Sequence, residues 1–298
     1  MNRLPGVLWI AAGAALWGTD TVLRRPLAGV LGSTQIVLYE HVILSFIVLP
    51  IIHRDRAYLS KIPLRIWLAV VGTAWIGSAL ATVLFTSAIG SGNPTTAVLL
   101  QKTQPLFAIL LARIVLRETT PRGFAWIAVV AIVGGYLVVF GNSRPLASGS
   151  LEVAPALLAL GAAASWAFAT VWGRIAVAEV PFELLTALRF VIALPVLIGA
   201  ALLQRQASVP ASEQLPSLLW MALVPGFAAL ILYYKGLRNT PASQATIAEL
   251  AFPATAAFLN WWILGVTATI LQLAGFLLVW AAILQLSRTP VRQVQQTV

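Results

Sequence analysis

The sequence has no cysteine and very little charge, since Asp, Glu, Lys and Arg together make up 9% of its 298 residues. The absence of cysteine excludes disulfides, thiolate catalysis and cysteine-bound metal ions. Soluble globular proteins carry roughly 25% charged residues, because their surface faces water. A chain that is 60% hydrophobic and this poor in charge therefore has lipid as the solvent for most of its exterior.

Motifs for phosphate binding and hydrolytic catalysis are also missing. The sequence contains no G-x-x-x-x-G-K-[ST] loop, no H-E-x-x-H helix and no G-x-S-x-G elbow. We therefore expect no enzyme activity, no catalytic residues, no metal site and no cofactor. The net charge of +10 does not indicate nucleic acid, because Lys and Arg lie in short clusters between apolar runs.

Long apolar runs dominate what is present. Runs of about 20 apolar residues, bounded by charge, Pro or Gly, predict transmembrane helices. The sequence predicts an all-α polytopic membrane protein with ten of them, and the first is expected to remain uncleaved. Their predicted ranges are 5–23, 33–52, 65–89, 94–114, 121–140, 153–173, 183–203, 217–237, 241–261 and 268–287.

The distribution of Lys and Arg predicts the orientation in the membrane. Thirteen of these residues fall on the side of the N-terminus and four on the opposite side. Because Lys and Arg are retained on the cytoplasmic side, both termini are predicted to be cytoplasmic. Arg24 and Arg25 are counted here as residues of an outer loop.

The two halves of the chain resemble each other weakly. An offset of 149 residues aligns Trp17 with Trp166, and an offset of 148 aligns Pro105 with Pro253. The offsets superimpose five apolar segments on five others, so residues 1–144 and 145–298 are predicted to be two repeats. Because five is odd, the second repeat is inverted, which is the usual construction of a secondary transporter.

Several short motifs, in this order and spacing, resemble those of a known family. They are Leu16-Trp17-Gly18, Pro94-Thr95-Thr96-Ala97, Gln104-Pro105, Leu116-Arg117-Glu118-Thr119-Thr120, Asn239-Thr240-Pro241-Ala242 and Glu249-Leu250-Ala251-Phe252-Pro253. The chain resembles an EamA-type member of the drug/metabolite transporter superfamily, and within it the bacterial exporters of aromatic and other neutral amino acids. One departure is that Glu118, which matches the family's acidic loop residue, aligns with Val266 in the second repeat.

Four charged residues lie well inside the predicted spans, namely Glu40, Lys102, Arg189 and Glu249, while Asp20 and Lys235 lie near helix ends. Such residues are costly in hydrocarbon and usually face a partner or a cavity. Glu40 aligns with Arg189, and Glu249 aligns with Gln101, next to Lys102. We therefore expect two ion pairs, Glu40–Lys102 and Arg189–Glu249. In the alternative use, Lys102 binds a substrate carboxylate, and Glu249 or Asp20 receives an amino group.

Aromatic side chains within the spans are candidates for the wall of a solute pathway. The predicted cavity residues are Trp17, Tyr39, Lys102, Trp166, Tyr233 and Glu249. Pro105 and Pro253 are repeat equivalents that interrupt their helices, so they are the hinge candidates.

The resemblance implies a secondary transporter in the bacterial inner membrane that exports small organic solutes, such as aromatic and neutral amino acids, by alternating access. Its partners are then the solute and the lipid bilayer, with no nucleic acid. Two alternatives stay open at this point: a carrier of another metabolite or drug with the same fold, and a solute channel. The sequence leaves the oligomeric state and proton coupling undetermined.

Overall fold

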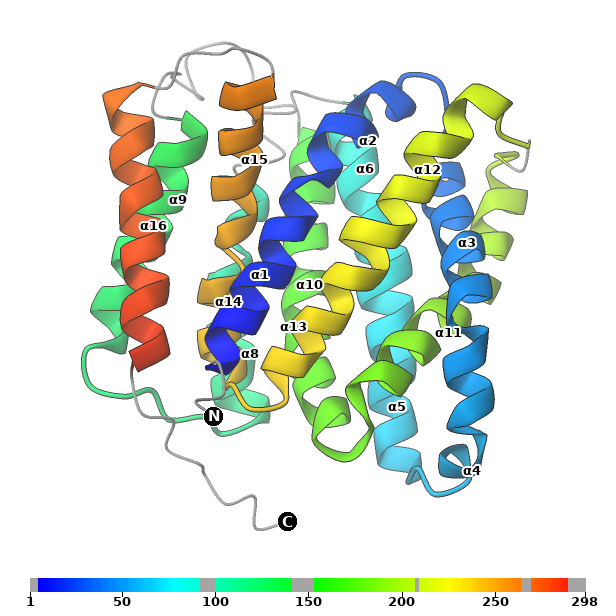
Figure 1. The fold of residues 1–298 in the computed structure, drawn as a ribbon, viewed down its shortest axis with the longest axis horizontal. Helices are drawn as coiled ribbons and strands as arrows, with labels where there is room; N and C mark the ends of the chain where they lie inside the picture. The colour runs from blue at the N-terminus through cyan, green and yellow to red at the C-terminus, as the bar shows by residue number, and fades with distance from the viewer. Residues whose placement is uncertain (1–4, 92–99, 141–152, 207–208, 264–268, 289–298) are drawn as a thin grey trace.

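The computed structural model describes residues 5–91, 100–140, 153–206, 209–263 and 269–288, and every regular element within them is helical. In the first half these are α1 Gly6–Gly18, α2 Asp20–Ala28, α3 Ser33–Arg54, α4 Arg56–Leu59, α5 Leu64–Gly72, η1 Thr73–Leu80, α6 Ala81–Ser91, α8 Gln104–Val115 and α9 Phe124–Phe140. In the second half they are α10 Val153–Glu179, α11 Phe182–Leu203, η2 Ser212–Gln214, α12 Leu215–Met221, η3 Ala222–Ala228, α13 Ala229–Leu237, α14 Ala242–Ala248, α15 Ala251–Ile263 and α16 Ile270–Arg288. The helices stand side by side, and α1 begins at the same edge at which α16 ends (Figure 1).

Within the described ranges, six helical stretches are long and apolar enough to cross a membrane, so the chain is a multi-pass membrane protein. They are Ser33–Arg54, Leu64–Ser91, Val153–Glu179, Phe182–Leu203, Ser212–Leu237 and Ile270–Arg288, and shorter apolar helices cover Gly6–Gly18, Gln104–Val115 and Phe124–Val139. Every predicted segment coincides with helix, although the starts of segments 94–114 and 268–287 lie outside the described residues.

Three of the predicted segments are interrupted rather than straight. Thr19 separates α1 from α2, residues 102–103 form a turn before α8, and residues 249–250 form a turn between α14 and α15. Pro105 and Pro253 each lie within the first turn of the helix that follows the interruption. Proline has no N–H to donate, so it is tolerated at a helix start and ends the helix that precedes it.

Two further stretches contain a π-helical segment in an otherwise continuous helix. η1 begins at Thr73 between α5 and α6, and η3 begins at Ala222 between α12 and α13. The starts of α3 and α11, each 22 residues long, are separated by the same 149 residues as the starts of η1 and η3. The π-helical segments of the two halves therefore recur at the offset of 149 residues, whereas the turns at 102–103 and 249–250 are 147 residues apart.

Close backbone contacts hold the helices together. α9 packs on α16, α1 on α13, α3 on α11 and α6 on α10. A Cβ atom added to Gly275 on α16 would lie 2.6 Å from the carbonyl oxygen of Gly134 on α9. Small residues are typical of such interfaces, because no hydrophobic force drives helices together in lipid and their association depends on close van der Waals packing instead.

The first predicted span ends too early. The segment predicted as 5–23 continues as α2 to Ala28, so Arg24 lies in a helix and is 8% exposed instead of lying in an outer loop. The guanidinium can be buried there because two carboxylates contact it, as described below.

Candidate functional site

A cavity with a volume of about 220 Å³ lies between helices of both halves of the chain. Five of the six predicted cavity residues line it: Trp17, Lys102, Trp166, Tyr233 and Glu249. Tyr39 is not among its lining residues and packs instead against an apolar cluster that contains Leu27, Leu31 and Leu218. Pro105 also lines the cavity.

Two pairs of aromatic rings border the cavity. The ring centroids of Trp17 and Tyr233 are 5.1 Å apart, and those of Phe85 and Trp166 are 5.2 Å apart. Each pair joins one half of the chain to the other. Trp17 aligns with Trp166, and Phe85 aligns with Tyr233 at the offset of 148. The two pairs are therefore equivalent contacts: in each pair the Trp of one half packs against the aligned aromatic residue of the other half.

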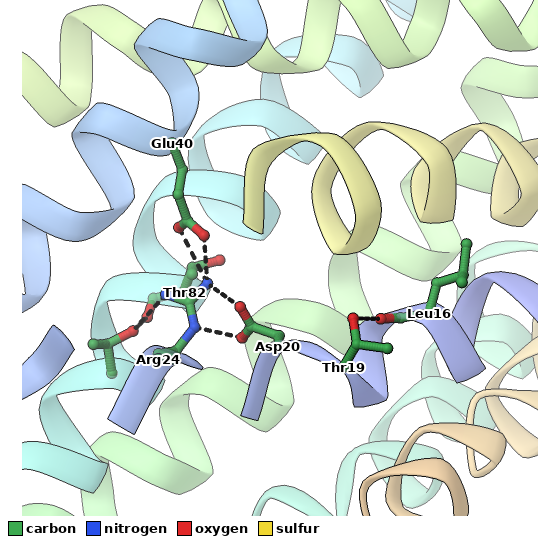
Figure 2. Close-up of polar contacts among 7 residues, drawn as sticks. Leu16, Thr19, Asp20, Arg24, Glu40 and Thr82 are labelled. Carbon is green, nitrogen blue, oxygen red and sulfur yellow. Dashed lines mark hydrogen bonds and ion pairs between the residues drawn. The ribbon is translucent and has the colours of Figure 1, made fainter. Parts of the chain in front are cut away.

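A buried cluster of three charges lies where α2, α3 and α6 meet. The Arg24 guanidinium donates to Asp20 through Nε at 2.5 Å and Nη2 at 3.1 Å, and its Nη2 donates to both oxygens of Glu40 at 2.8 and 3.1 Å. Figure 2 shows the guanidinium between the two carboxylates. All three residues line the cavity. One cation here faces two anions.

The predicted pair Glu40–Lys102 is wrong, because Arg24 from the neighbouring helix is the partner of Glu40. The predicted pair Arg189–Glu249 is not formed either. Arg189 donates from Nε to Ser78 Oγ at 2.5 Å and from Nη1 to the Tyr234 hydroxyl at 2.9 Å. Within the described residues no carboxylate lies within 4.0 Å of its guanidinium. Neutral hydroxyls take the place of the expected ion pair.

Glu249, at the turn between α14 and α15, is held by three neutral donors. Gln104 Nε2 donates to one oxygen at 2.6 Å, while the hydroxyls of Tyr233 and Thr170 contact the other at 2.9 and 3.2 Å. The donors come from α8, α13 and α10. The carboxylate therefore ties the interrupted segment 242–263 to three other helices.

Lys102 lies in the other interrupted segment, in the turn before α8. Its Nζ donates to Gln101 Oε1 at 2.7 Å and lies 4.4 Å from the centre of the Phe252 ring. Gln101 Nε2 then donates to Gln104 Oε1 at 3.2 Å, and Gln104 donates to Glu249. Lys102 and Glu249 are thus joined by a chain of hydrogen bonds through two glutamine amides.

Sequence reasoning missed the two glutamines and the role of Arg24. A signal for the glutamines existed, because Gln101-Lys102-Thr103-Gln104 places four polar residues together within an apolar run. The i, i+4 spacing of Asp20 and Arg24 was the corresponding signal for the charge cluster.

Two other buried polar atoms on the cavity wall have no hydrogen-bond partner in the part of the chain that the structure describes. They are Nε2 of His41, whose Nδ1 contacts the Val37 carbonyl oxygen at 2.8 Å, and Oγ1 of Thr246. Across the same described residues, His, Asp and Glu form no group of three or more that could hold a metal ion.

Polar contacts also join the halves at the edge where α1 begins. Glu118, in the loop after α8, accepts from the backbone N–H of Ala242 at 2.7 Å and from Ser243 N–H and Oγ at 3.0 and 2.7 Å. Glu118 therefore caps the first turn of α14. A second contact between the halves joins the start of α5 to the end of α10, where Arg65 Nη2 lies 2.7 Å from Glu179 Oε1.

A bundle of membrane helices around a cavity with aromatic and charged walls is the architecture of a solute carrier. The chain belongs to the EamA-like transporter family, whose profile matches residues 4–141 and 154–288. It is therefore a membrane transporter, with a transport role rather than an enzymatic one.

Similar proteins agree with this assignment. The chain is 29% identical to the riboflavin transporter ImpX of Fusobacterium nucleatum over 96% of this chain and 99% of that protein. It is also 29% identical to the uncharacterized transporter YwfM of Bacillus subtilis, over 78% of this chain and 82% of that one. One crystal structure shares the fold with a TM-score of 0.77 at 16% sequence identity, over 93% of this chain and 94% of the other.

Proposed function

We propose that this transporter exports small organic solutes, and aromatic and other neutral amino acids in particular, by alternating access around the cavity. The observation that carries the proposal is the cavity itself, in which aromatic ring pairs adjoin fixed charges of both signs. The ring of an aromatic amino acid can pack on the aromatic pairs, and its zwitterionic head group can interact with the charged side chains. Apolar walls with a few placed polar groups are typical of sites for such solutes.

The proposed mechanism requires two inverted repeats of five transmembrane helices, residues 1–144 and 145–298. The two family matches support it, and so does the 149-residue offset between the π-helical segments η1 and η3. The interruptions before Pro105 and Pro253 then act as the hinges at which the halves rock. In this scheme the protein lies in a bacterial inner membrane with both termini in the cytoplasm, as the excess of Lys and Arg on that side supports.

Riboflavin is the second candidate substrate, because the similarity to a riboflavin transporter extends over almost the whole chain. A flat tricyclic ring could stack on the same aromatic pairs. Unlike an amino acid, riboflavin carries no charge, so it would form no ion pair with the charged side chains of the cavity.

Counterflow in proteoliposomes tests the proposal. Vesicles containing only this protein are preloaded with an unlabelled neutral amino acid, and labelled tryptophan, phenylalanine, threonine, alanine or riboflavin is added outside. We expect saturable accumulation of an aromatic amino acid above the level in empty liposomes. A second set of vesicles is preloaded with unlabelled riboflavin. If labelled riboflavin accumulates in these vesicles and no amino acid accumulates in the first set, riboflavin replaces the amino acids as the assigned substrate. Flux that shows no counterflow and does not saturate would identify a channel.

A further inference from the structure

The hydrogen-bond chain from Lys102 to Glu249 has a fixed direction. All its atoms belong to side chains. Lys102 Nζ donates to Gln101 Oε1, Gln101 Nε2 donates to Gln104 Oε1, and Gln104 Nε2 donates to the Glu249 carboxylate. A cation at one end and an anion at the other both favour this orientation of the amides. Such chains polarise their members, so each bond is strengthened by the next.

The two ends of the chain differ in what they can still bind. The Glu249 carboxylate already contacts three donors from three helices. An ammonium group has three N–H donors, and in the described residues Lys102 uses one, to Gln101. No carboxylate of the described residues lies within 4.0 Å of its Nζ. The Phe252 ring contacts one side of the ammonium, and the cavity lies beside it.

The neighbouring charges do not supply the missing anion. Glu40 and Asp20 are both occupied by Arg24. A cation in a membrane interior is costly without a counter-charge, and an incoming anion would supply one. Among the described residues, two donors of Lys102 therefore have no hydrogen-bond acceptor, whereas the Glu249 carboxylate is not equally open.

We propose that the transporter recognises its substrate by an anionic group, a carboxylate, which binds the Lys102 ammonium. Gln101 and Gln104 are positioning residues that hold this ammonium toward the cavity by tethering it to Glu249. Glu249 acts through the chain and does not receive the substrate's amino group. The inference rests on the proposed function, since it deepens the assignment of a carboxylate-bearing aromatic solute.

A matched series of competitors tests the carboxylate. Phenylalanine, 3-phenylpropionate and phenylalaninamide share the ring, but the second lacks the amino group and the third lacks the carboxylate. Against labelled phenylalanine in counterflow, we expect phenylalaninamide to compete about tenfold more weakly than phenylalanine, the loss of one charge-assisted hydrogen bond. Equal competition by phenylalaninamide would overturn the proposal.

Variants of Lys102 identify the residue that makes the distinction. In the Lys102→Met variant, phenylalanine and phenylalaninamide should compete equally well with labelled phenylalanine. In Lys102→Arg, phenylalanine should remain the stronger competitor. Lys235→Met is the matched control, because Lys235 also lies over an aromatic ring, 3.7 Å from the centre of Trp9, but does not line the cavity. An unchanged preference in Lys102→Met, with unchanged elution on gel filtration, would contradict the proposal.

Binding to the purified protein separates this inference from the proposed function. By isothermal titration, 3-phenylpropionate should bind the wild type and Lys102→Arg, and it should bind Lys102→Met about tenfold more weakly. Its amide should bind all three weakly. This result would support the anion site even if no amino acid were transported. Equal binding of the acid and its amide would overturn the anion site even if phenylalanine were transported. Gln101→Leu should weaken binding of the acid alone, and unchanged binding would remove Gln101 as a positioning residue.

Discussion

Arg24 Nη2 lies 2.8 Å from Glu40 Oε1 in the interior of the helix bundle, while its Nε binds Asp20. The arrangement is unequal, because removal of either carboxylate leaves Arg24 paired, but removal of Arg24 leaves two buried carboxylates together. A buried charge that loses its partner costs about 3–5 kcal/mol. The stability of this region therefore depends more on the cation than on either anion.

We predict that Arg24→Gln lowers the free energy of unfolding by about 3–5 kcal/mol, whereas Glu40→Gln lowers it by about 1 kcal/mol. Thermal unfolding of the purified protein in detergent measures the difference. Arg54→Gln is the control, because its pair with Asp55 is exposed and should contribute nothing measurable. Equal losses in Arg24→Gln and Glu40→Gln would contradict the unequal arrangement.

Removal of the Glu118 cap should loosen the contact between the halves. Glu118→Ala deletes three hydrogen bonds to the start of α14, so we expect a loss of about 0.5–2 kcal/mol of stability. Hydrogen exchange of the amides of Ala242 and Ser243 should accelerate in the same variant. Glu213→Ala, which removes an exposed carboxylate, should change neither quantity. Unchanged exchange at α14 would show that the cap does not hold the helix end.

The close approach of α9 and α16 should not tolerate a side chain. Gly275→Val places atoms against the backbone of Gly134 and Val138, and overpacking of this kind costs about 1–3 kcal/mol. Gly199→Val on α11 is the control, since an added Cβ there meets nothing within 4 Å. Thermal unfolding should separate the two variants by several degrees, about 2–4 °C per kcal/mol. Similar midpoints would indicate that the helices can separate without cost.

The aromatic wall should govern the affinity for aromatic solutes. Trp17→Ala removes the ring that contacts Tyr233, so we expect the KM for tryptophan to rise about tenfold, the effect of about 1.4 kcal/mol of lost stacking and burial. The KM for alanine should change much less. Trp126→Ala, at an exposed position outside the cavity, should leave both values unchanged. Equal effects of Trp17→Ala on tryptophan and alanine would remove Trp17 from the binding wall.

The helices could be predicted from the sequence, but the pairing of charges could not. Apolar runs locate membrane helices because lipid requires them, and the structure has helix in every predicted segment. Partners depend on how helices rotate and cross, which periodicity does not give. The prediction placed Arg24 in a loop, and it therefore assigned Lys102 instead of Arg24 as the ion-pair partner of Glu40. It also followed charge alone and thus overlooked Gln101 and Gln104, although a neutral amide can also donate a hydrogen bond to a buried carboxylate, as Gln104 does to Glu249.

The proposed mechanism depends most on movement of the two halves at the edge where Glu118 contacts the start of α14. The chain has no cysteine, so Glu118→Cys and Ser243→Cys can be introduced as its only thiols and joined with a short bifunctional maleimide. Counterflow of phenylalanine, or of whichever solute accumulates in the counterflow assay proposed for this protein, is then measured before and after cross-linking, with each single-cysteine variant treated in the same way. Alternating access predicts that cross-linking abolishes counterflow in the double variant alone. Full counterflow after complete cross-linking would contradict it, because solute would then cross without the halves separating at this edge.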